Sequence, residues 1–280
     1  YIFIFGKFGM PRMEIQGAAI GTLIARLFEF GIICGYFFLK DTKISYRIRD
    51  LQKKCGDLFS EYINIGVPVF VSDALLALGS SAVAMIMGRI GKEFVSANSI
   101  TFVTQQLSTV MIQGVCQAGC IVTGHTLGRG ERKKAQEQAW TFLILGILIG
   151  AAAGIVILFI NEAVIGCYNI KEETKEIARQ LMSAISIIVI FQSTNSIMMK
   201  GVLRGGGDTK FLMVADILFL WVVSVPLGAL AGLYWHLSAF WIYFFLKIDQ
   251  VLKAFWCVFR LKSGKWMKGI SGSMKSAINE

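Results

Sequence analysis

The octapeptide Leu203-Arg204-Gly205-Gly206-Gly207-Asp208-Thr209-Lys210 joins two long apolar segments of this 280-residue chain. Three consecutive glycines permit backbone angles that other residues avoid, and charged groups are costly to place between apolar segments. The glycine spacing and flanking strand of a phosphate-binding loop or a dinucleotide fingerprint are missing. We therefore interpret the octapeptide as a structural joint, with Arg204 and Lys210 anchoring it at lipid headgroups. The residues expected to shape the turn are Arg204, Gly205, Gly206, Gly207, Asp208 and Lys210.

The amino-acid composition indicates that most of this chain is surrounded by lipid and not by water. Hydrophobic residues make up 55% and charged residues only 16% of it, and the mean hydropathy is +0.63, outside the range of soluble globular proteins. A spanning helix needs about 20 apolar residues. We predict an all-α integral membrane protein with seven transmembrane helices, over residues 15–39, 63–88, 96–122, 139–161, 180–201, 211–233 and 238–259.

The distribution of basic residues predicts the topology. Segments 40–62, 128–138, 200–210 and 260–280 carry 18 Lys or Arg, whereas the alternate segments 1–14, 88–94 and 162–179 carry 7. Retention of positive loops in the cytoplasm places the C-terminus inside a multi-pass protein of the cell membrane. The net charge of +10 is spread over loop ends, which argues against a nucleic-acid partner.

Four parts follow from this pattern. Residues 1–40 hold an outer segment and one helix, and 41–61 form an amphipathic linker that we expect at the cytoplasmic membrane surface. Residues 62–260 form a compact six-helix unit, and 261–280 a basic cytoplasmic tail. The apolar opening of the chain lacks an initiating Met and a charged leader, which favours a fragment of a longer product over a signal peptide.

Metal and enzyme chemistry are poorly supported. Cys116 and Cys120 are four residues apart, but two thiols without a third ligand make a poor metal site. His125 and His236 lie at opposite ends of the predicted bundle, and no nucleophile–base pair appears. We expect no cofactor, no bound metal and no enzymatic activity.

Ionisable residues inside a bilayer are functional candidates, since each costs on the order of 3 kcal/mol or more. The candidates for binding a coupling ion are Asp216, Asp73 and Asp249. Asp216 lies about six residues into its span, roughly 9 Å deep, where desolvation penalises its charge; it could exchange a proton or coordinate Na⁺. Alternatively, Asp216 forms a salt bridge to Lys247, Asp249 pairs locally with Lys253, and Asp73 bonds neighbouring hydroxyls.

Polar residues also recur down the third predicted span every three or four positions. Such a stripe must face a water-filled cavity or other helices, so either a substrate chamber or interhelical hydrogen bonding explains it. With a polar patch in the fifth span, the candidates for lining a chamber are Asn98, Thr101, Gln105, Thr109, Gln113, Ser193 and Asn195.

Two further features of the sequence concern the packing of helices. Gly146, Gly150 and Gly154 form a ridge of small residues that lets helix backbones approach closely. Pro68 and Pro226 lie within spans and predict helix kinks, which suit either a moving helix or a static bundle.

The motifs of this chain resemble those of the MATE (multidrug and toxic compound extrusion) efflux transporters, in order and spacing. Residues 17–21 are similar to their sixth helix, 65–68 to the start of the seventh, and 123–131 to the turn after the eighth, with His125 where glutamine is commoner. Residues 201–210 resemble the turn between the tenth and eleventh helices, Trp221 with Pro226 the eleventh, and Lys253, Arg260 and 263–266 the last helix and tail.

The resemblance implies a fold of twelve helices in two six-helix lobes, of which this chain holds the last helix of the first lobe and the whole second lobe. One branch of the family binds Na⁺ through carboxylates of the seventh and tenth helices. Here Ser193 stands at the tenth-helix position, and Asp73 is displaced by about one turn.

The resemblance implies a secondary transporter that exports organic cations or amphipathic drugs in exchange for H⁺ or Na⁺, by alternating access. Its partners would be the bilayer and small cationic or amphipathic molecules. Two alternatives remain: a flippase of lipid-linked oligosaccharides, which needs a cationic cavity, and a truncated membrane scaffold that transports nothing.

Overall fold

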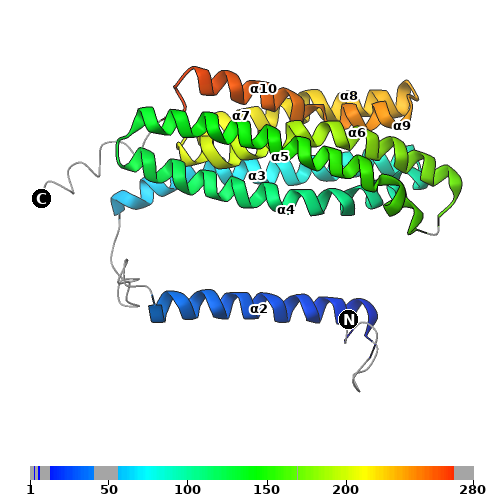
Figure 1. Ribbon diagram of the computed structural model, residues 1–280, viewed down its shortest axis with the longest axis horizontal. Helices are drawn as coiled ribbons and strands as arrows, with labels where there is room; N and C mark the ends of the chain where they lie inside the picture. Colours follow the sequence, from blue (N-terminus) through cyan, green and yellow to red (C-terminus); the bar gives the residue numbers. More distant parts are fainter. Residues whose placement is uncertain (1–2, 4–5, 7–12, 41–55, 169, 268–280) are drawn as a thin grey trace, which may run out of the picture. The chain divides into compact units, whose positions relative to one another are not determined.

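The computed structural model describes residues 3, 6, 13–40, 56–168 and 170–267. It divides into two compact units, Tyr1–Phe59 and Ser60–Glu280, which we describe separately (Figure 1). None of the described residues lies in a β-strand, which confirms the all-α prediction. Of the linker predicted over 41–61, residues 41–55 lie outside the described part, as do residues 268–280 of the predicted tail.

The first unit contains helix α2 (Glu14–Lys40), whose segment Ile15–Phe38 is long and apolar enough to cross a membrane. Its large apolar side chains are exposed within the unit, among them Leu27 and Phe28. The Arg26 guanidinium donates to Glu29 at 2.6 Å on the same helix. A helix with apolar side chains all round requires lipid or other helices as its surroundings.

The second unit is a bundle of long helices. Its first four are α3 (Gly56–Ile90), α4 (Lys92–Gly128), α5 (Arg132–Gly166) and α6 (Glu172–Ser196), the last continuing as the π-helix η2 (Ile197–Leu203). After the glycine turn follow α7 (Thr209–Ile217), the π-helix η3 (Leu218–Ser224), α8 (Val225–Ala229) and the π-helix η4 (Leu230–Tyr234). The described bundle ends with α9 (Ala239–Leu246) and α10 (Ile248–Lys262).

Five described helices are long and apolar enough to span a membrane, and α4 adds a sixth if its two bent halves form one span. The seventh predicted span, 238–259, corresponds to α9 and α10, which are separated at Lys247 and are each too short to cross alone. The predicted count of seven is therefore approximate, because the last crossing is divided at a lysine.

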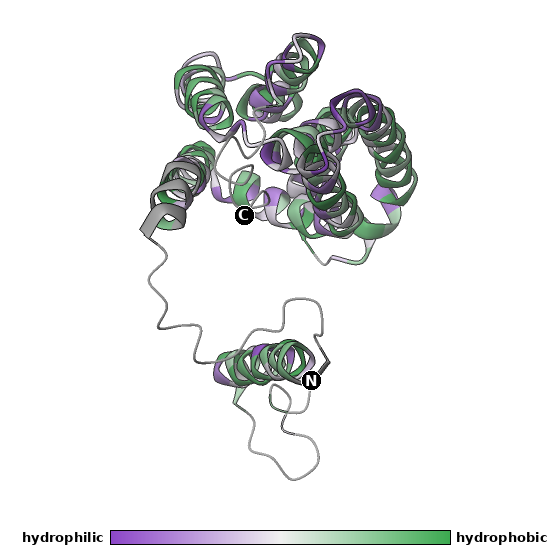
Figure 2. Ribbon diagram, turned by 90° about the vertical axis from the view of Figure 1, so that its left-hand side faces the viewer, coloured by the Kyte–Doolittle hydropathy of each residue, from purple (hydrophilic) through white to green (hydrophobic). Residues whose placement is uncertain are grey.

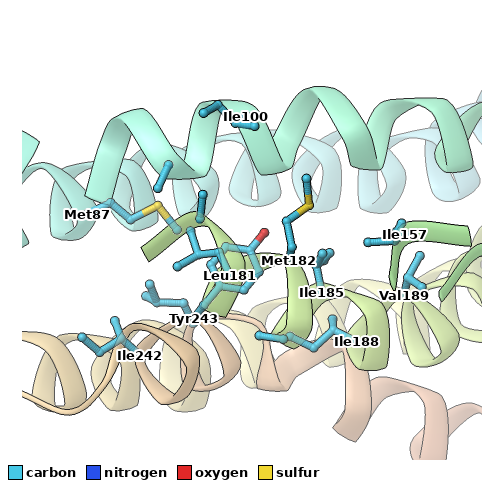
Figure 3. Packing of buried hydrophobic residues seen from close by; sticks show 14 of the residues in the cluster. Met87, Ile100, Ile157, Leu181, Met182, Ile185, Ile188, Val189, Ile242 and Tyr243 are labelled. Carbon is cyan, nitrogen blue, oxygen red and sulfur yellow. The ribbon is translucent and has the colours of Figure 1, made fainter. Parts of the chain in front are cut away.

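Helix α6 forms the centre of the bundle. It contacts α4, α5, α9 and α10, and 67% of the apolar window of α6 and η2 is buried, against 28% for α5. Figure 3 shows Leu181, Met182, Ile185 and Ile188 of α6 among side chains of the neighbouring helices. Outward-facing apolar side chains such as Phe159 remain exposed, and hydrophobic residues colour much of the surrounding helices (Figure 2). The bundle thus presents an apolar surface suited to lipid.

The predicted glycine ridge lies at the interface between α5 and α6. A Cβ added at Gly146 would lie 3.1 Å from Thr194 Cα, and one at Gly150 would lie 2.7 Å from Ile190 Cα. At Gly154 it would meet the Ser186 carbonyl oxygen. Two antiparallel helices therefore touch backbone to backbone at every fourth residue, which confirms the predicted close approach.

Each glycine of the 205–207 turn has a separate structural reason. A Cβ at Gly205 would lie 2.6 Å from the Cys120 carbonyl oxygen on α4, and one at Gly206 would lie 2.5 Å from Trp266 Cε3. Gly207 has a φ of +82°, a conformation that favours glycine. Two of these glycines serve close packing, and only the third serves the backbone angle of the turn.

A contact between the end of α10 and the turn holds the two together. The guanidinium of Arg260 donates to Asp208 Oδ2 at 2.7 Å and lies 4.5 Å from the centre of the Phe211 ring. Trp266 is fully buried, and its indole N–H donates to Gln136 Oε1 at 3.0 Å. The buried carboxylate of Asp208 is thus paired, and the turn is fixed to α5 and to the residues after α10.

The two prolines lie in different helical settings. Pro68 is inside α3, and Pro226 is in the first turn of α8, directly after η3. A proline removes one backbone hydrogen bond, and π-helical turns often accompany such irregularities. A gating role for either proline stays a prediction.

We predict that Gly150→Ala destabilises the bundle. The added methyl group meets backbone atoms of α6 that cannot move aside, so the free energy of unfolding should fall by about 1–3 kcal/mol. The loss would be measured by thermal denaturation of the purified protein. Gly114→Ala is the matched control, since nothing lies within 4 Å of that position. Equal stability of the two variants would contradict backbone contact between α5 and α6.

We predict that Gly206→Ala loosens residues 263–267 from the turn. The methyl group would occupy the place of the Trp266 ring, and tryptic cleavage after Lys262 and Lys265 should accelerate. Gly128→Ala, at a position with nothing within 4 Å, should leave the cleavage rate unchanged. An unchanged rate in Gly206→Ala would show that Trp266 does not hold this segment.

A candidate ion and substrate site in the bundle

Two adjoining cavities lie between the helices of the second unit, with volumes of about 270 and 390 Å³. The smaller, cavity 1, is lined from α3, α4, α6, η2, α7 and α10; the larger, cavity 2, extends to α9. Both are lined by Leu76, Thr109, Gln192 and Gln250. Polar groups of several helices therefore converge on one region of an otherwise apolar bundle, as in ligand sites generally.

Three charged side chains form a buried cluster beside these cavities. Lys253 Nζ lies 2.9 Å from Asp216 Oδ1 and 3.2 Å from Asp249 Oδ2. The lysine side chain is 2% exposed, and the two carboxylates are 13% and 4% exposed. Asp249 and Lys253 share a face of α10 at a spacing of four residues, and Asp216 approaches from α7.

Neutral side chains extend this charged cluster across the bundle. Ser72 Oγ on α3 donates to Asp216 Oδ2 at 2.6 Å, and Gln250 Nε2 donates to Asp249 Oδ2 at 2.8 Å. Asn195 Nδ2 on α6 in turn donates to Gln250 Oε1 at 2.8 Å. Four segments, α3, α6, α7 and α10, are thereby joined through one polar network.

The cluster has an excess of negative charge when all three groups are ionised. Two carboxylates share one ammonium group in a region where charge is poorly solvated, and buried ions need compensation. A further cation, or a proton on one carboxylate, would balance it, because neighbouring carboxylates disfavour joint ionisation. The geometry thus suits the exchange of one positive charge.

The ion pairs differ in part from the sequence-based expectation. The local pair of Asp249 and Lys253 is present, but Asp216 contacts Lys253 and not Lys247. Lys247 and Lys253 are six residues apart, so even on a continuous helix they would lie on different faces. The predicted alternative partner Lys247 is therefore wrong, and Lys253 takes its place.

Asp73, the third candidate, lies apart from this cluster. Its carboxylate accepts from Arg204 Nη2 at 3.3 Å and is 52% exposed. It lines neither of the two cavities. Arg204 therefore connects the glycine turn to α3, where we had expected it to anchor the turn at the lipid headgroups.

The candidate chamber residues are divided between the two cavities. Cavity 1 is lined by Thr109, Gln113 and Asn195, and cavity 2 by Asn98, Gln105 and Thr109. Gln105 Nε2 also donates to Gln192 Oε1 at 2.6 Å. Thr101 and Ser193 are buried and line neither cavity: the Thr101 hydroxyl donates to the Ala97 carbonyl, and Ser193 packs beside Gly150.

Sequence reasoning did not single out several residues of the site. Ser72, Lys200 and Gln250 line cavity 1, and Tyr243 lines cavity 2. The two adjacent polar residues Asp249 and Gln250, within a largely apolar span, were a sequence signal for a polar site on α10. Both residues line cavity 2, which helical periodicity does not predict for adjacent positions.

These features define an integral membrane helical bundle with an internal polar site, and comparison with known proteins identifies its family. Residues 68–230 match the MatE family model. The chain belongs to the MatE family, and its resemblance to MATE transporters is confirmed.

Curated relatives and solved structures agree with this assignment. The chain is 26% identical over 271 residues to a probable multidrug resistance protein NorM of Thermotoga maritima, covering 96% of this chain and 57% of the relative. A Pasteurella multocida protein of the same name is 26% identical over 236 residues, covering 81% of this chain and 49% of the relative. This chain thus spans about half the length of these relatives.

The solved structures share the fold. The Vibrio cholerae MATE transporter VcmN in its bent form has a TM-score of 0.76 at 15% identity, over 94% of this chain and 58% of that protein. A MOP superfamily transporter from Pyrococcus furiosus has a TM-score of 0.78 at 18% identity, over 94% and 59%.

We predict that Lys253→Met strongly destabilises the bundle. It leaves two carboxylates buried without their cation, which should cost roughly 3–5 kcal/mol, measured by thermal denaturation of the purified protein. Combining Lys253→Met with Asp216→Asn and Asp249→Asn should restore most of the loss. Wild-type stability of the single variant would mean that the cluster does not carry its charges in the folded protein.

Proposed function

We propose that this chain is part of a multidrug efflux transporter that exports organic cations or amphipathic drugs by cation-coupled antiport. The protein works in the cell membrane, with its C-terminus in the cytoplasm, and catalyses no chemical reaction. Membership of the MatE family and the relatives' name as probable multidrug resistance proteins support this function. The positive-inside distribution of Lys and Arg supports the orientation.

The observation that carries the proposal is the Asp216–Lys253–Asp249 cluster beside the cavities. The coupling ion binds this cluster, neutralises its excess negative charge and is released when substrate occupies the neighbouring space. Binding of one species then lowers the affinity for the other, which is the coupling that exchange requires.

The geometry favours a proton over Na⁺ as the coupling ion. Lys253 Nζ already occupies the position between Asp216 Oδ1 and Asp249 Oδ2, and an ammonium group supplies no oxygen ligand to a metal ion. A proton needs only one carboxylate oxygen. The other charged or titratable groups nearby are Cys257 beside the cluster, Lys200 and Arg204 in cavity 1, and Tyr243 and Lys247 in cavity 2, which Asp249 also lines.

Helix irregularities offer the movement that alternating access needs. The last crossing is interrupted at Lys247, and the α7–η4 crossing alternates between α- and π-helical turns. Interrupted helices next to substrate and ion sites are common in secondary transporters. In this proposal the interruption lets α9 and α10 tilt separately as the cluster takes up and releases its proton.

We predict that a pH gradient drives dye efflux and that a Na⁺ gradient does not. The native-length product carrying this sequence would be reconstituted in proteoliposomes, with rhodamine 6G as the probe. Asp216→Asn should reduce pH-driven efflux at least tenfold while dye binding persists, because the amide cannot exchange a proton. Glu137→Gln, on an exposed part of α5, is the control. Efflux driven by Na⁺ alone, or full pH-driven efflux in Asp216→Asn, would overturn the proposal.

A further inference from the structure

The two cavities carry more basic than acidic side chains. Lys200, Arg204 and Lys253 line cavity 1 together with Asp216, and Lys247 lines cavity 2 together with Asp249. Four cations thus face two carboxylates. A chamber that only received organic cations would have the opposite balance, since like charges repel at short range.

Two of these cations are already neutralised. Lys253 is shared by Asp216 and Asp249, and Arg204 contacts Asp73 at 3.3 Å. Neither Lys200 nor Lys247 takes part in any ion pair recorded among the described residues. Lys200 is exposed, whereas Lys247 is only partly accessible.

Lys247 has the more unusual position of the two. It separates α9 from α10 and follows Ala239, the first residue of α9, by eight positions, which is about 12 Å along a helix. A lysine at such a depth in a membrane protein is expensive and normally has a partner. Around cavity 2, Asn98, Gln106 and Tyr243 add groups able to donate hydrogen bonds.

We propose that Lys247 forms the anionic subsite of cavity 2 and binds the negatively charged group of an amphiphilic substrate. This inference rests on the proposed transport function and deepens it by adding anionic amphiphiles to the cargo. The ammonium of Lys247 pairs with a carboxylate, sulfonate or phosphate oxygen, and the amide and phenol groups bond its remaining oxygens. The apolar residues of the cavity, including Val83 and Phe102, contact the hydrocarbon part of the ligand.

The test compares two xanthene dyes of similar size and opposite charge, fluorescein and rhodamine 6G. Binding of each to the purified native-length protein is measured by fluorescence anisotropy. Lys247→Gln should weaken fluorescein binding roughly ten- to a hundredfold, the loss typical of a hydrogen bond to a charged group. Rhodamine 6G affinity should stay the same or increase. Lys247→Arg should retain most fluorescein binding, since the charge remains.

Lys262→Gln is the matched control, because it removes one charge from an exposed position at the far end of the adjoining helix α10. A natural ligand of the subsite could be an anionic lipid headgroup or a soluble organic anion. The two are distinguished by adding phosphatidylglycerol to the detergent micelles that hold the purified protein. Displacement of fluorescein from the wild type indicates that an anionic lipid headgroup takes the subsite. Undiminished fluorescein binding indicates a soluble organic anion; both results support the subsite.

Three results would overturn the inference: absence of fluorescein binding to the wild type, equal fluorescein affinity in Lys247→Gln, or an equal loss for both dyes. A protein that still moves rhodamine 6G under a pH gradient while failing this test keeps its proposed function and loses only the anionic subsite. A protein that neither moves rhodamine 6G under a pH gradient nor passes this binding test fails the proposed function itself.

Discussion

The contact of one ammonium group with two carboxylates is the constraint on which the site depends. Lys253 is almost completely buried and touches both Asp216 and Asp249. Separating the partners would leave charge in a medium that solvates it poorly, so α7 and α10 must stay together while the cluster is ionised. The excess of one negative charge makes that attachment sensitive to a further cation. The same interaction therefore stabilises the packing of α7 against α10 and makes that packing respond to the binding of a cation.

Backbone contacts fix the frame around this cluster. Gly146, Gly150 and Gly154 bring α5 against α6, and Gly205 brings the turn against α4. In lipid, association of helices relies on close packing and not on the hydrophobic effect, so these contacts determine where the polar groups of α6 lie. Asn195 and Gln192, one turn apart on α6, reach the cavities as a result.

Much of this arrangement could be predicted from the sequence, because membrane helices and small-residue ridges leave strong patterns. The all-helical fold, the close approach at Gly150 and the Asp249–Lys253 pair follow from hydropathy and from helical spacing. The partner of Asp216 could not be predicted, since Asp216 and Lys253 lie on different helices and their contact depends on how α7 packs against α10. Ser193 was expected in a chamber, but its side chain turns toward Gly150. A polar side chain of a membrane helix can face either a cavity or a neighbouring helix. The periodicity of polar residues does not show which of the two it faces.

The central claim is that the Asp216–Lys253–Asp249 cluster holds a proton that substrate displaces. The most direct measurement is proton release when rhodamine 6G is added to the purified native-length protein in weakly buffered solution. The account predicts release of about one proton per bound dye molecule, as reciprocal coupling requires, and no release from Asp216→Asn. Binding of the dye without proton release, or equal release from Asp216→Asn, would contradict it.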